Sequence, residues 1–577
     1  MIEQLAADNA DDGAPVEGIL LRYEALARDR PSINSFSRRQ LEDCGLFSVF
    51  QVESLVDYRK AYGDILSAGE LSLVDGFNSK LASTISIFFS FTSDSDIASP
   101  QEESHLQQEM TLKAKGSWTP ERPSLTFKYS ASKGRDLFFG MTVDHDAGER
   151  LVNGVMPDFV SAYASFSCRG MLRQLIVGDY TIRAGQGLVI WKAFGLSTFG
   201  PPASLSRNAQ VLRPYASTDE ANFLRGAAAS FRLGRADVTA FVSANSLDAR
   251  IVGDTTYTSI VDGGYHRTES KIAKRHTMRE YLVGSHLEWE SGHFRYGLTG
   301  LAYSYDKTNA RTVKKYNRYQ LYDGWWGDAS ADIYCFWRDC RIFAEAAVDY
   351  GGSPAALAGV IWSPSYNLEA GLLGRCYSRS YIATHAGASS ALSSCSNQRG
   401  LDASARWILS SLCTLSCNVG YSYFPWSRYG IDGPSNAFKC RLSIVANISS
   451  SSSVDIPGSP SPSWRVNTIF PLGGRCRLNL RYAGNPHGNG GYMDLVWSPG
   501  RRLKITARYT VCDTRDWDSR LYFYESGVPG AFSIESWYGK RKGVYLLVKY
   551  SPFKCVDLWL KASDRNYAFF TRIFIPG

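Results

Sequence analysis

The pattern of hydrophobic and polar positions changes near residue 105 and divides the chain into two parts. Before that point apolar residues recur every three to four positions; in 16–29, Ile19, Leu20, Tyr23 and Leu26 share one helical face. Ser, Asn and Gly residues between the apolar runs are typical of helix boundaries. We therefore expect short helices over Val16–Asp29, from Ser35 or Ser37 to Gly45, from Ser48 or Gln51 to Gly63, from Ser67 to Gly76, and after a capping Asn78.

After residue 105 the period is two, and it stays so to the C-terminus. Leu503, Ile505 and Ala507, for example, alternate with Lys504 and Thr506. Such alternation predicts strands with one apolar and one polar face. Similar runs lie at 106–115, 125–130, 137–144, 222–233, 236–246, 279–290, 293–305, 341–350, 400–410, 437–448, 475–482, 542–550 and 554–563.

The connections between these strands alternate in length. Short turns rich in Gly, Asp or Ser alternate with long polar loops at 247–278, 306–328, 379–399 and 449–462. Strands of about ten residues, with short turns at one end and long loops at the other, are typical of a transmembrane β-barrel. At roughly 20 residues per strand and connection, the body holds about 24 strands, an even number in the range of about 20–26. The alternative is a soluble all-β protein, but no propeller blade repeat is visible.

Composition narrows the class of protein further. Hydrophobic residues make up 44% of the 577 positions and aromatic residues 13%, whereas charged residues make up only 20%. The chain is therefore too apolar to be disordered, and it has no apolar run of about 18 residues that would predict a membrane-spanning helix. Residues 1–100 hold 8 Lys and Arg against 16 Asp and Glu, whereas the remainder holds 55 against 39. An acidic head thus precedes a basic body.

The head, over residues 31–86, resembles the tandem helix-hairpin-helix of competence-type DNA-binding proteins. In that family a Gly-hydrophobic-Gly hairpin points backbone amides at a DNA phosphate. The resemblance makes two turns the candidate hairpin sites, Gly45, Leu46, Phe47 and Ser48 in the first and Gly76, Phe77 and Asn78 in the second. Both turns depart from the family pattern, and the first lacks its second glycine. Because the head is acidic, a protein-docking domain is the competing interpretation.

A second resemblance covers the first third of the body. Four segments resemble the hallmark stretch of helix-hairpin-helix outer-membrane barrel proteins of Gram-negative bacteria. They are Gly178-Asp179-Tyr180 and residues 185–191, 213–220 and 223–227. The resemblance implies an outer-membrane location, and it singles out the motif residues Gly178, Asp179, Gly185, Gln186, Gly187, Glu220, Arg225 and Gly226. The 185–187 element lacks the strand-turn-helix context of a nucleotide site, so we interpret it as a close backbone approach. Residues 192–220 are then expected to form an inward loop or partial plug.

The polar strand faces of the body are basic, and in a barrel they line the lumen. The alternation directs Lys113, Lys115, Lys128 and Lys549 inward, together with the candidate basic lumen residues Lys439, Arg441, Arg475, Arg477, Arg481, Arg502, Lys504 and Arg508. A cationic wall would concentrate anions and select for them. The alternative is that these residues pair with acidic residues across strands.

Side chains that would carry catalysis form no recognisable set. The 12 cysteines are dispersed, and Cys335 and Cys340 flank a turn across which they could form a disulfide. The 8 histidines show no ligand spacing. We therefore expect no enzyme, no cofactor and no metal site. The N-terminus, Met1-Ile2-Glu3-Gln4, carries no basic and apolar leader, so we expect a mature chain or a start that lies downstream of the true one.

These observations give one architecture and two hypotheses for function. We expect a mainly β fold, a large antiparallel transmembrane β-barrel over 105–577, preceded by a small all-α periplasmic domain over 1–91 and a linker over 92–104. The first hypothesis is a channel or translocation module for an anionic polymer such as DNA. The second is an envelope scaffold whose acidic head docks other proteins. The opposite charges predict that the head covers or enters the periplasmic opening, its acidic face toward inward arginines and lysines.

Overall fold

The computed structural model comprises a helical head and a large barrel. It describes residues 23, 26–27 and 30–575, apart from 94–105, 120–121, 135, 150–156, 169, 193–199, 262, 265, 411, 450–451, 459–462 and 531–532. Residues 94–104 of the predicted linker over 92–104, and most of the predicted helix over 16–29, lie outside the described residues.

In the described part of the head, over residues 30–93, four helices occur, at α3 (Arg38–Asp43), α4 (Val49–Tyr62), α5 (Ala68–Leu71) and α6 (Ser79–Ile85). Each begins at a side-chain cap, and Ser37 and Ser48 each form a capping box with a glutamine three residues later. A core that includes Leu41, Leu55 and Phe88, each at most 1% exposed, holds the helices together.

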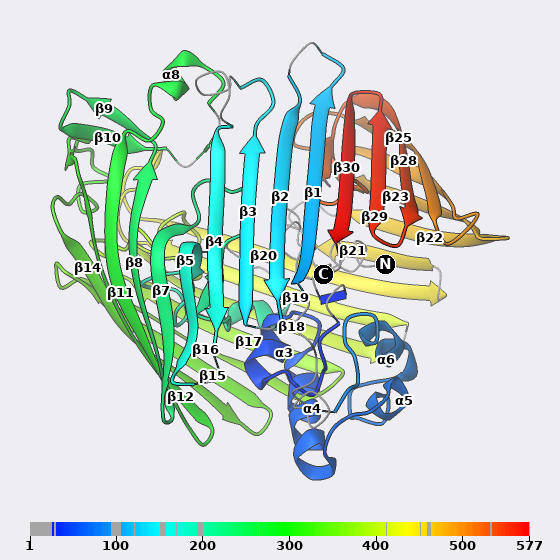
Figure 1. The fold of residues 1–577 in the computed structure, drawn as a ribbon, viewed down its shortest axis with the longest axis horizontal. Helices are drawn as coiled ribbons and strands as arrows, with labels where there is room; N and C mark the ends of the chain where they lie inside the picture. The colour runs from blue at the N-terminus through cyan, green and yellow to red at the C-terminus, as the bar shows by residue number, and fades with distance from the viewer. Residues whose placement is uncertain are drawn as a thin grey trace.

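The body is a closed antiparallel barrel whose first strand, β1, pairs with its last strand, β30 (Figure 1). Among the described residues 25 strands share one sheet; 24 of them form the wall, and the short β6 pairs with β5 beside β7. Within the described residues each wall strand therefore pairs with a neighbour on both sides, as a membrane requires. The wall consists of β1 (Leu106–Ser117), β2 (Ser124–Lys133), β3 (Leu137–His145), β4 (Phe159–Ser167), β5 (Leu172–Ile182), β7 (Leu224–Leu233), β8 (Ala236–Leu247), β11 (Met278–Ser291), β12 (Phe294–Tyr305), β14 (Trp326–Trp337), β15 (Cys340–Asp349), β16 (Pro354–Ser365), β17 (Leu368–Tyr377), β18 (Gln398–Ser410), β19 (Cys413–Phe424), β20 (Ser435–Ser449), β21 (Ser452–Gly458), β22 (Trp464–Gly473), β23 (Cys476–Asn485), β24 (Gly488–Trp497), β25 (Leu503–Thr514), β28 (Lys540–Phe553), β29 (Val556–Ser563) and β30 (Asn566–Ile575).

The remaining elements lie in the long connections. They are η1 (Pro202–Leu205), β6 (Leu212–Pro214), β9 (Ala249–Val252), β10 (Thr256–Ile260), α8 (Glu269–Ile272), β13 (Thr308–Asn309), β26 (Leu521–Glu525) and β27 (Ser533–Trp537). Every second connection along the wall is short, and these short turns all lie at one end of the barrel, opposite β9, β10 and α8 (Figure 1).

The outward face of the barrel is apolar and carries an aromatic girdle. Aliphatic side chains such as Val242, Leu298 and Leu495 are 43–54% exposed, as expected of residues that contact lipid. Close to the short turns lie outward tryptophans that are 45–60% exposed, at Trp289, Trp337, Trp362, Trp407 and Trp497. Such girdles mark a membrane interface, so the barrel spans a membrane. Among the described residues no helix is both long and apolar enough to cross a membrane.

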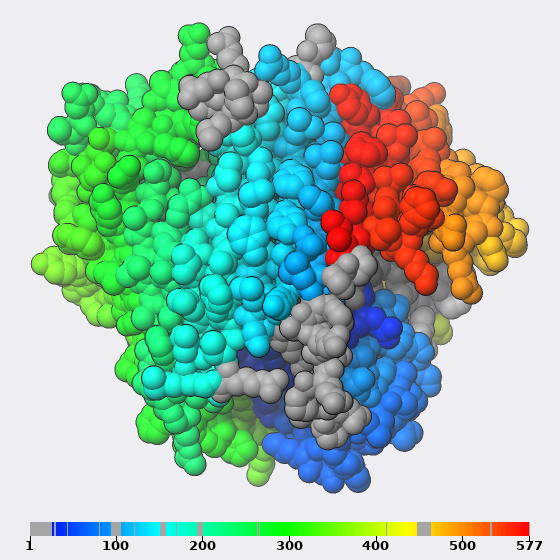
Figure 2. All heavy atoms as spheres, viewed as in Figure 1, coloured from blue at the N-terminus to red at the C-terminus, as the bar shows by residue number. Residues whose placement is uncertain are grey.

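The head lies at the short-turn end of the barrel (Figures 1 and 2). Bacterial single-chain barrels of even strand number reside in the outer membrane, with their short turns in the periplasm. The protein is accordingly an outer-membrane barrel with a periplasmic N-terminal domain. The predicted fold class and strand number are confirmed.

One predicted loop is wrong. The stretch 449–462 contains β21, which pairs with β20 on one side and β22 on the other. Its serine-rich sequence is typical of a loop. A barrel, however, must pair every backbone position at membrane depth, and this requirement overrides local propensity.

Candidate functional site

The glycine, aspartate and arginine of the motif stretch lie where β5 meets β7. Gly178 and Gly226 face each other across the two strands with φ of 106° and 159°. A Cβ on either residue would lie 2.2 Å from a neighbouring backbone oxygen, so only glycine fits. One residue further, Arg225 donates to both carboxylate oxygens of Asp179, at 2.7 and 2.9 Å. This bidentate pair joins β5 and β7 next to the point where the chain leaves β5 for the lumen.

Beyond β5 the chain forms a nest for a buried carboxylate of the wall. Gly185 and Gly187 have φ of 55° and 89°, which turns successive amides the same way. The N–H groups of Gln186 and Leu188 both donate to one oxygen of Glu345 on β15, at 2.7 and 3.1 Å. Glu345 is 2% exposed. The backbone of residues 186–188 therefore binds this part of the chain to β15 of the wall.

The segment from Arg183 to Phe223, which we call the inward segment, runs inside the barrel. The Gln186 side chain bonds both the backbone oxygen (3.0 Å) and the backbone N–H (2.8 Å) of Arg207, which closes the segment on itself. The hydroxyl of Tyr381 donates to the Leu188 oxygen at 2.9 Å. Leu188, Leu205 and Leu212 share one apolar core with side chains of the wall. The inward segment starts earlier than the predicted 192–220, and its residues 193–199 are outside the described part.

The inward segment also contacts the head, and both contact the wall. Glu42 of α3 pairs with Arg341 of β15 at 2.6 Å, and the two side chains are 3% and 5% exposed. The Glu42 carboxylate also accepts from the Asn208 side chain. Arg39 of α3 pairs with Glu288 of β11 at 2.7 Å and donates to the Ala209 oxygen. One helix of the head thus holds residues 208–209 of the inward segment against the barrel.

The head therefore enters the periplasmic opening, but the predicted charge pairing is only partly right. Glu42 faces an inward arginine as expected, whereas Arg39 pairs with a barrel glutamate. The Arg38 guanidinium lies 4.3 Å from the ring centroid of Phe336. A buried charged side chain needs an oppositely charged partner next to it, whatever the net charges of the two domains. The opposite net charges of head and body therefore predict that the head docks, but not which residues pair.

The seven candidate hairpin residues mainly build the head. Phe47 and Phe77 are 8% and 7% exposed and belong to its core, against which Leu46 packs. Ser48 and Asn78 cap α4 and α6. Gly45 and Gly76 have positive φ, and their backbone oxygens accept from Tyr23 and Gln51. Two helix pairs flank these turns, but the comparisons below give no helix-hairpin-helix family, so this resemblance remains a prediction.

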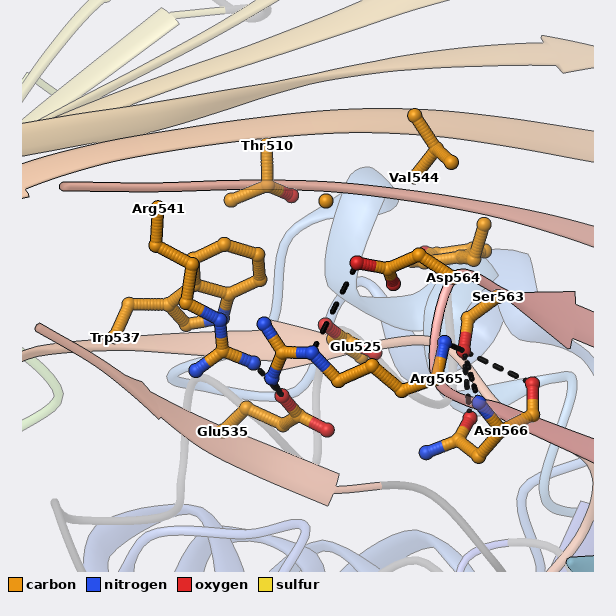
Figure 3. A pocket seen from close by; sticks show the side chains of 12 residues that line it. Thr510, Glu525, Glu535, Trp537, Arg541, Val544, Ser563, Asp564, Arg565 and Asn566 are labelled. Atoms are coloured by element: carbon orange, nitrogen blue, oxygen red, sulfur yellow. Dashed lines mark hydrogen bonds and ion pairs between the residues drawn. The ribbon is translucent and has the colours of Figure 1, made fainter. Parts of the chain in front are cut away.

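A second connection folds into the lumen between β25 and β28. Its hairpin, β26–β27, brings Ile534 against the core of the head. Figure 3 shows Arg541 and Arg565 pointing toward Glu535 of this hairpin, at 3.1 and 3.6 Å. Glu525 pairs with Lys561 of β29 at 3.1 Å. The hairpin is thus attached to the wall by ion pairs, whereas the inward segment is attached by hydrogen bonds and apolar packing.

Most of the candidate basic residues lie on the lumen side of the wall. In β20, Lys439 and Arg441 alternate with the outward Phe438 and Leu442. Arg477 and Arg481 of β23 and Lys504 of β25 do the same on their strands. Arg508 is also inward, but it is bound at 2.6 Å to Asp494, so it adds little net charge.

Two of the predicted lumen residues lie elsewhere. Arg475 lies in the turn between β22 and β23 and donates to the Pro499 oxygen, and Arg502 lies in the turn before β25. Each of these two arginines lies one residue before its strand, in a periplasmic turn. Side chains in a tight turn do not follow the alternation of a strand, so the period of two does not place them.

Glu220 belongs to a cluster of charged side chains in the extracellular loops. Both ring nitrogens of His266 contact carboxylates. Nδ1 contacts Asp158, and Nε2 contacts Asp248 at 2.5 Å. Burial opposes the charge on this ring, but the hydrogen bonds to the two carboxylates outweigh it and raise the pKa of His266 to about 10. Burial, followed by the charge of Asp158, raises the pKa of Glu220 to about 8.

Glu149, Asp158 and His266 also bring three metal-type ligand atoms within 4.8 Å of one another. Both ring nitrogens of His266 already contact carboxylates, and Arg275 pairs with Asp158 at 2.8 Å. The set is a hydrogen-bonded network in which one protonated histidine bridges two loops. The expectation that the protein has no metal site therefore stays a prediction.

This network predicts loops that loosen at high pH. A histidine whose folded pKa is raised to about 10 contributes stability below its unfolded pKa, near 6.5, and loses it as pH rises toward 10. Ionisation of Glu220 above about pH 8 adds repulsion in the same direction. Trypsin cleavage after Arg267 should rise about tenfold or more between pH 7 and 9.5, relative to cleavage after exposed Lys554. His266→Gln should remove most of this pH dependence; an unchanged ratio in the wild type would contradict the assignment.

Sequence reasoning missed the residues that receive the inward segment and the head. Glu345, Glu288 and Arg341 lie on the inward faces of β15 and β11, where polar residues are expected in any barrel. Their only sequence signal is a charged residue at a lumen position among small or apolar neighbours, as for Glu345 in Ala344-Glu345-Ala346.

Comparisons with known proteins give weak structural likeness only. No protein-family model matches the chain, and no curated protein matches it. The siderophore receptor PirA from Acinetobacter baumannii superposes with a TM-score of 0.39 at 7% identity, covering 82% of this chain and 80% of its own. The FrpB iron transporter from Neisseria meningitidis gives 0.38 at 10% identity, covering 84% of each chain. At these identities and TM-scores the matches assign neither a family nor a ligand to this protein.

Proposed function

We propose that this protein is a gated transport barrel, without enzymatic activity, that passes small anionic solutes across the outer membrane. The observation that carries the proposal is that parts of the chain outside the wall lie in the lumen. The inward segment, the β26–β27 hairpin and the head each contact the wall through hydrogen bonds or ion pairs, and the inward segment also shares an apolar core with the wall. Because β5 pairs directly with β7, and β25 with β28, the wall keeps its strand pairing when these parts move.

The lumen wall opposite the apolar core supports an anionic cargo. Lys439, Arg441, Arg477 and Lys504 face inward there, whereas the acidic Asp494 on the same wall is already bound to Arg508. A basic wall lowers the barrier for anions and raises it for cations. DNA as cargo has less support, because the hairpin residues that would bind phosphate are used inside the acidic head.

The test is the ion selectivity of an opened barrel. The variant Arg39→Met/Glu42→Met, reconstituted in planar bilayers, should give a reversal potential on the anion side under a KCl gradient. Lys439→Gln/Arg441→Gln in the same background should move it toward zero. Cation selectivity would reject an anionic cargo. A folded variant that never conducts would favour the alternative function, a scaffold whose head docks envelope proteins.

A further inference from the structure

A cavity of about 320 Å³ lies in the lumen between the wall and both inward elements. Strands β1, β2, β3, β4 and β30 form its outer side. Ala216 and Thr218 of the inward segment and residues 529–530, in the turn of the β26–β27 hairpin, form its inner side. It is the meeting point of the two inward elements that close the barrel. Its volume is within the range of small-molecule sites in proteins.

Three cationic side chains line this cavity, Lys113, Lys128 and Arg572. The carboxylates that face them are Glu109, which lies 3.3 Å from Arg572, and the neighbouring Asp144, which accepts from Thr126. The positive charges thus exceed the negative ones. Hydroxyl groups complete the lining, at Thr111, Thr126, Ser130, Thr142 and Thr218. Cations and hydroxyls together suit a small anion that also carries hydroxyl groups.

The two lysines already hold the inward elements in place. The Lys128 ammonium donates to the Ala216 oxygen of the inward segment at 2.8 Å. The Lys113 ammonium donates to the Gly530 oxygen of the hairpin at 2.9 Å. A neutral carbonyl is a weaker acceptor for an ammonium than a phosphate or carboxylate oxygen is. An anion in the cavity therefore competes with these two carbonyls for the same donors.

We propose that this cavity binds a small hydroxylated anion, such as a sugar phosphate, and that its binding detaches both inward elements from Lys113 and Lys128. The cavity lies on the lumen side of the wall, so its ligand comes from solution and not from the lipid. The release step rests on the proposed function, because the transported anion would itself detach the elements that lie in the lumen. The binding step does not depend on transport.

The binding test uses the full-length protein in detergent and isothermal titration calorimetry with glucose 6-phosphate. Saturable binding is expected, with no heat from glucose at the same concentrations. Lys113→Gln/Lys128→Gln should weaken binding about tenfold or more, because two charge-assisted bonds are lost. Lys133→Gln, on the exposed end of β2, is the matched control and should bind as the wild type does. Absence of saturable binding, or equal affinity in the double variant and the control, would overturn the site.

Hydrogen exchange tests the release step on the same samples. Amides of residues 214–218 and 526–530 should exchange faster at saturating glucose 6-phosphate, whereas those of the wall strands β15–β17 should not change. Slower or unchanged exchange at both inward elements would overturn release. Neither calorimetry nor hydrogen exchange measures current, so both can be interpreted even if the barrel does not conduct in bilayers. Conversely, absence of binding or release would not affect the test of ion selectivity.

Discussion

Replacing Arg39 and Glu42 together by methionine should release the head from the barrel mouth. Each substitution removes the nearest counter-charge of a buried partner, Glu288 or Arg341. Arg295, at 3.8 Å, compensates Glu288 only in part. Breaking a buried pair from one side costs about 3–5 kcal/mol. The docked state should therefore be disfavoured by at least about a hundredfold, and the opening frequency in single-channel recordings should rise accordingly.

The matched control for this variant is an exposed ion pair on the same head. Lys60 and Asp57 lie 3.9 Å apart and their side chains are 69% and 73% exposed, so Lys60→Gln/Asp57→Asn should leave the recordings unchanged. Since the Arg39 and Glu42 pairs are largely buried, wild-type docking should also persist at high salt. Equal opening frequencies in all three proteins would mean that the head does not close the lumen.

Replacing Glu345 by leucine should detach the start of the inward segment from the wall. The carboxylate oxygen that accepts from Gln186 and Leu188 is lost, and each buried N–H left without an acceptor costs about 1–3 kcal/mol. Amide exchange over 183–192 should rise at least about tenfold, and the barrel strands should keep their protection. Glu345→Gln retains an acceptor oxygen and should show a smaller effect. Unchanged exchange in the leucine variant would show that other contacts position this segment.

The period-two pattern predicts the barrel because a membrane imposes one rule on every strand. Outward positions must be apolar and closure must be complete, so alternation and turn lengths suffice to give the architecture and the strand number. The same rule explains the failure at 449–462, where closure of the wall imposes a strand on a sequence with poor strand propensity.

The closure of the lumen could be predicted only in part. Gly185 and Gly187 indicate a close backbone approach, but nothing in the sequence pairs them with Glu345, about 160 residues later. The contact depends on which strands face each other across the barrel, and alternation carries no such information. The net charge of the head likewise predicts docking. In the sequence, however, Arg39 and Glu42 are ordinary charged residues of a short amphipathic helix, and only the folded barrel shows which residues they pair with.

Single-channel conductance of a barrel without its inward segment shows whether this barrel is a conduit closed from within. Because β5 and β7 are neighbours in the sheet, residues 185–220 can be replaced by a four-residue Gly-Ser turn in the Arg39→Met/Glu42→Met background. We predict a folded barrel with a large, persistent, anion-selective conductance, against brief openings of the wild type. A folded barrel that opens no more often and no longer than the wild type would show that the inward segment does not close a conduit.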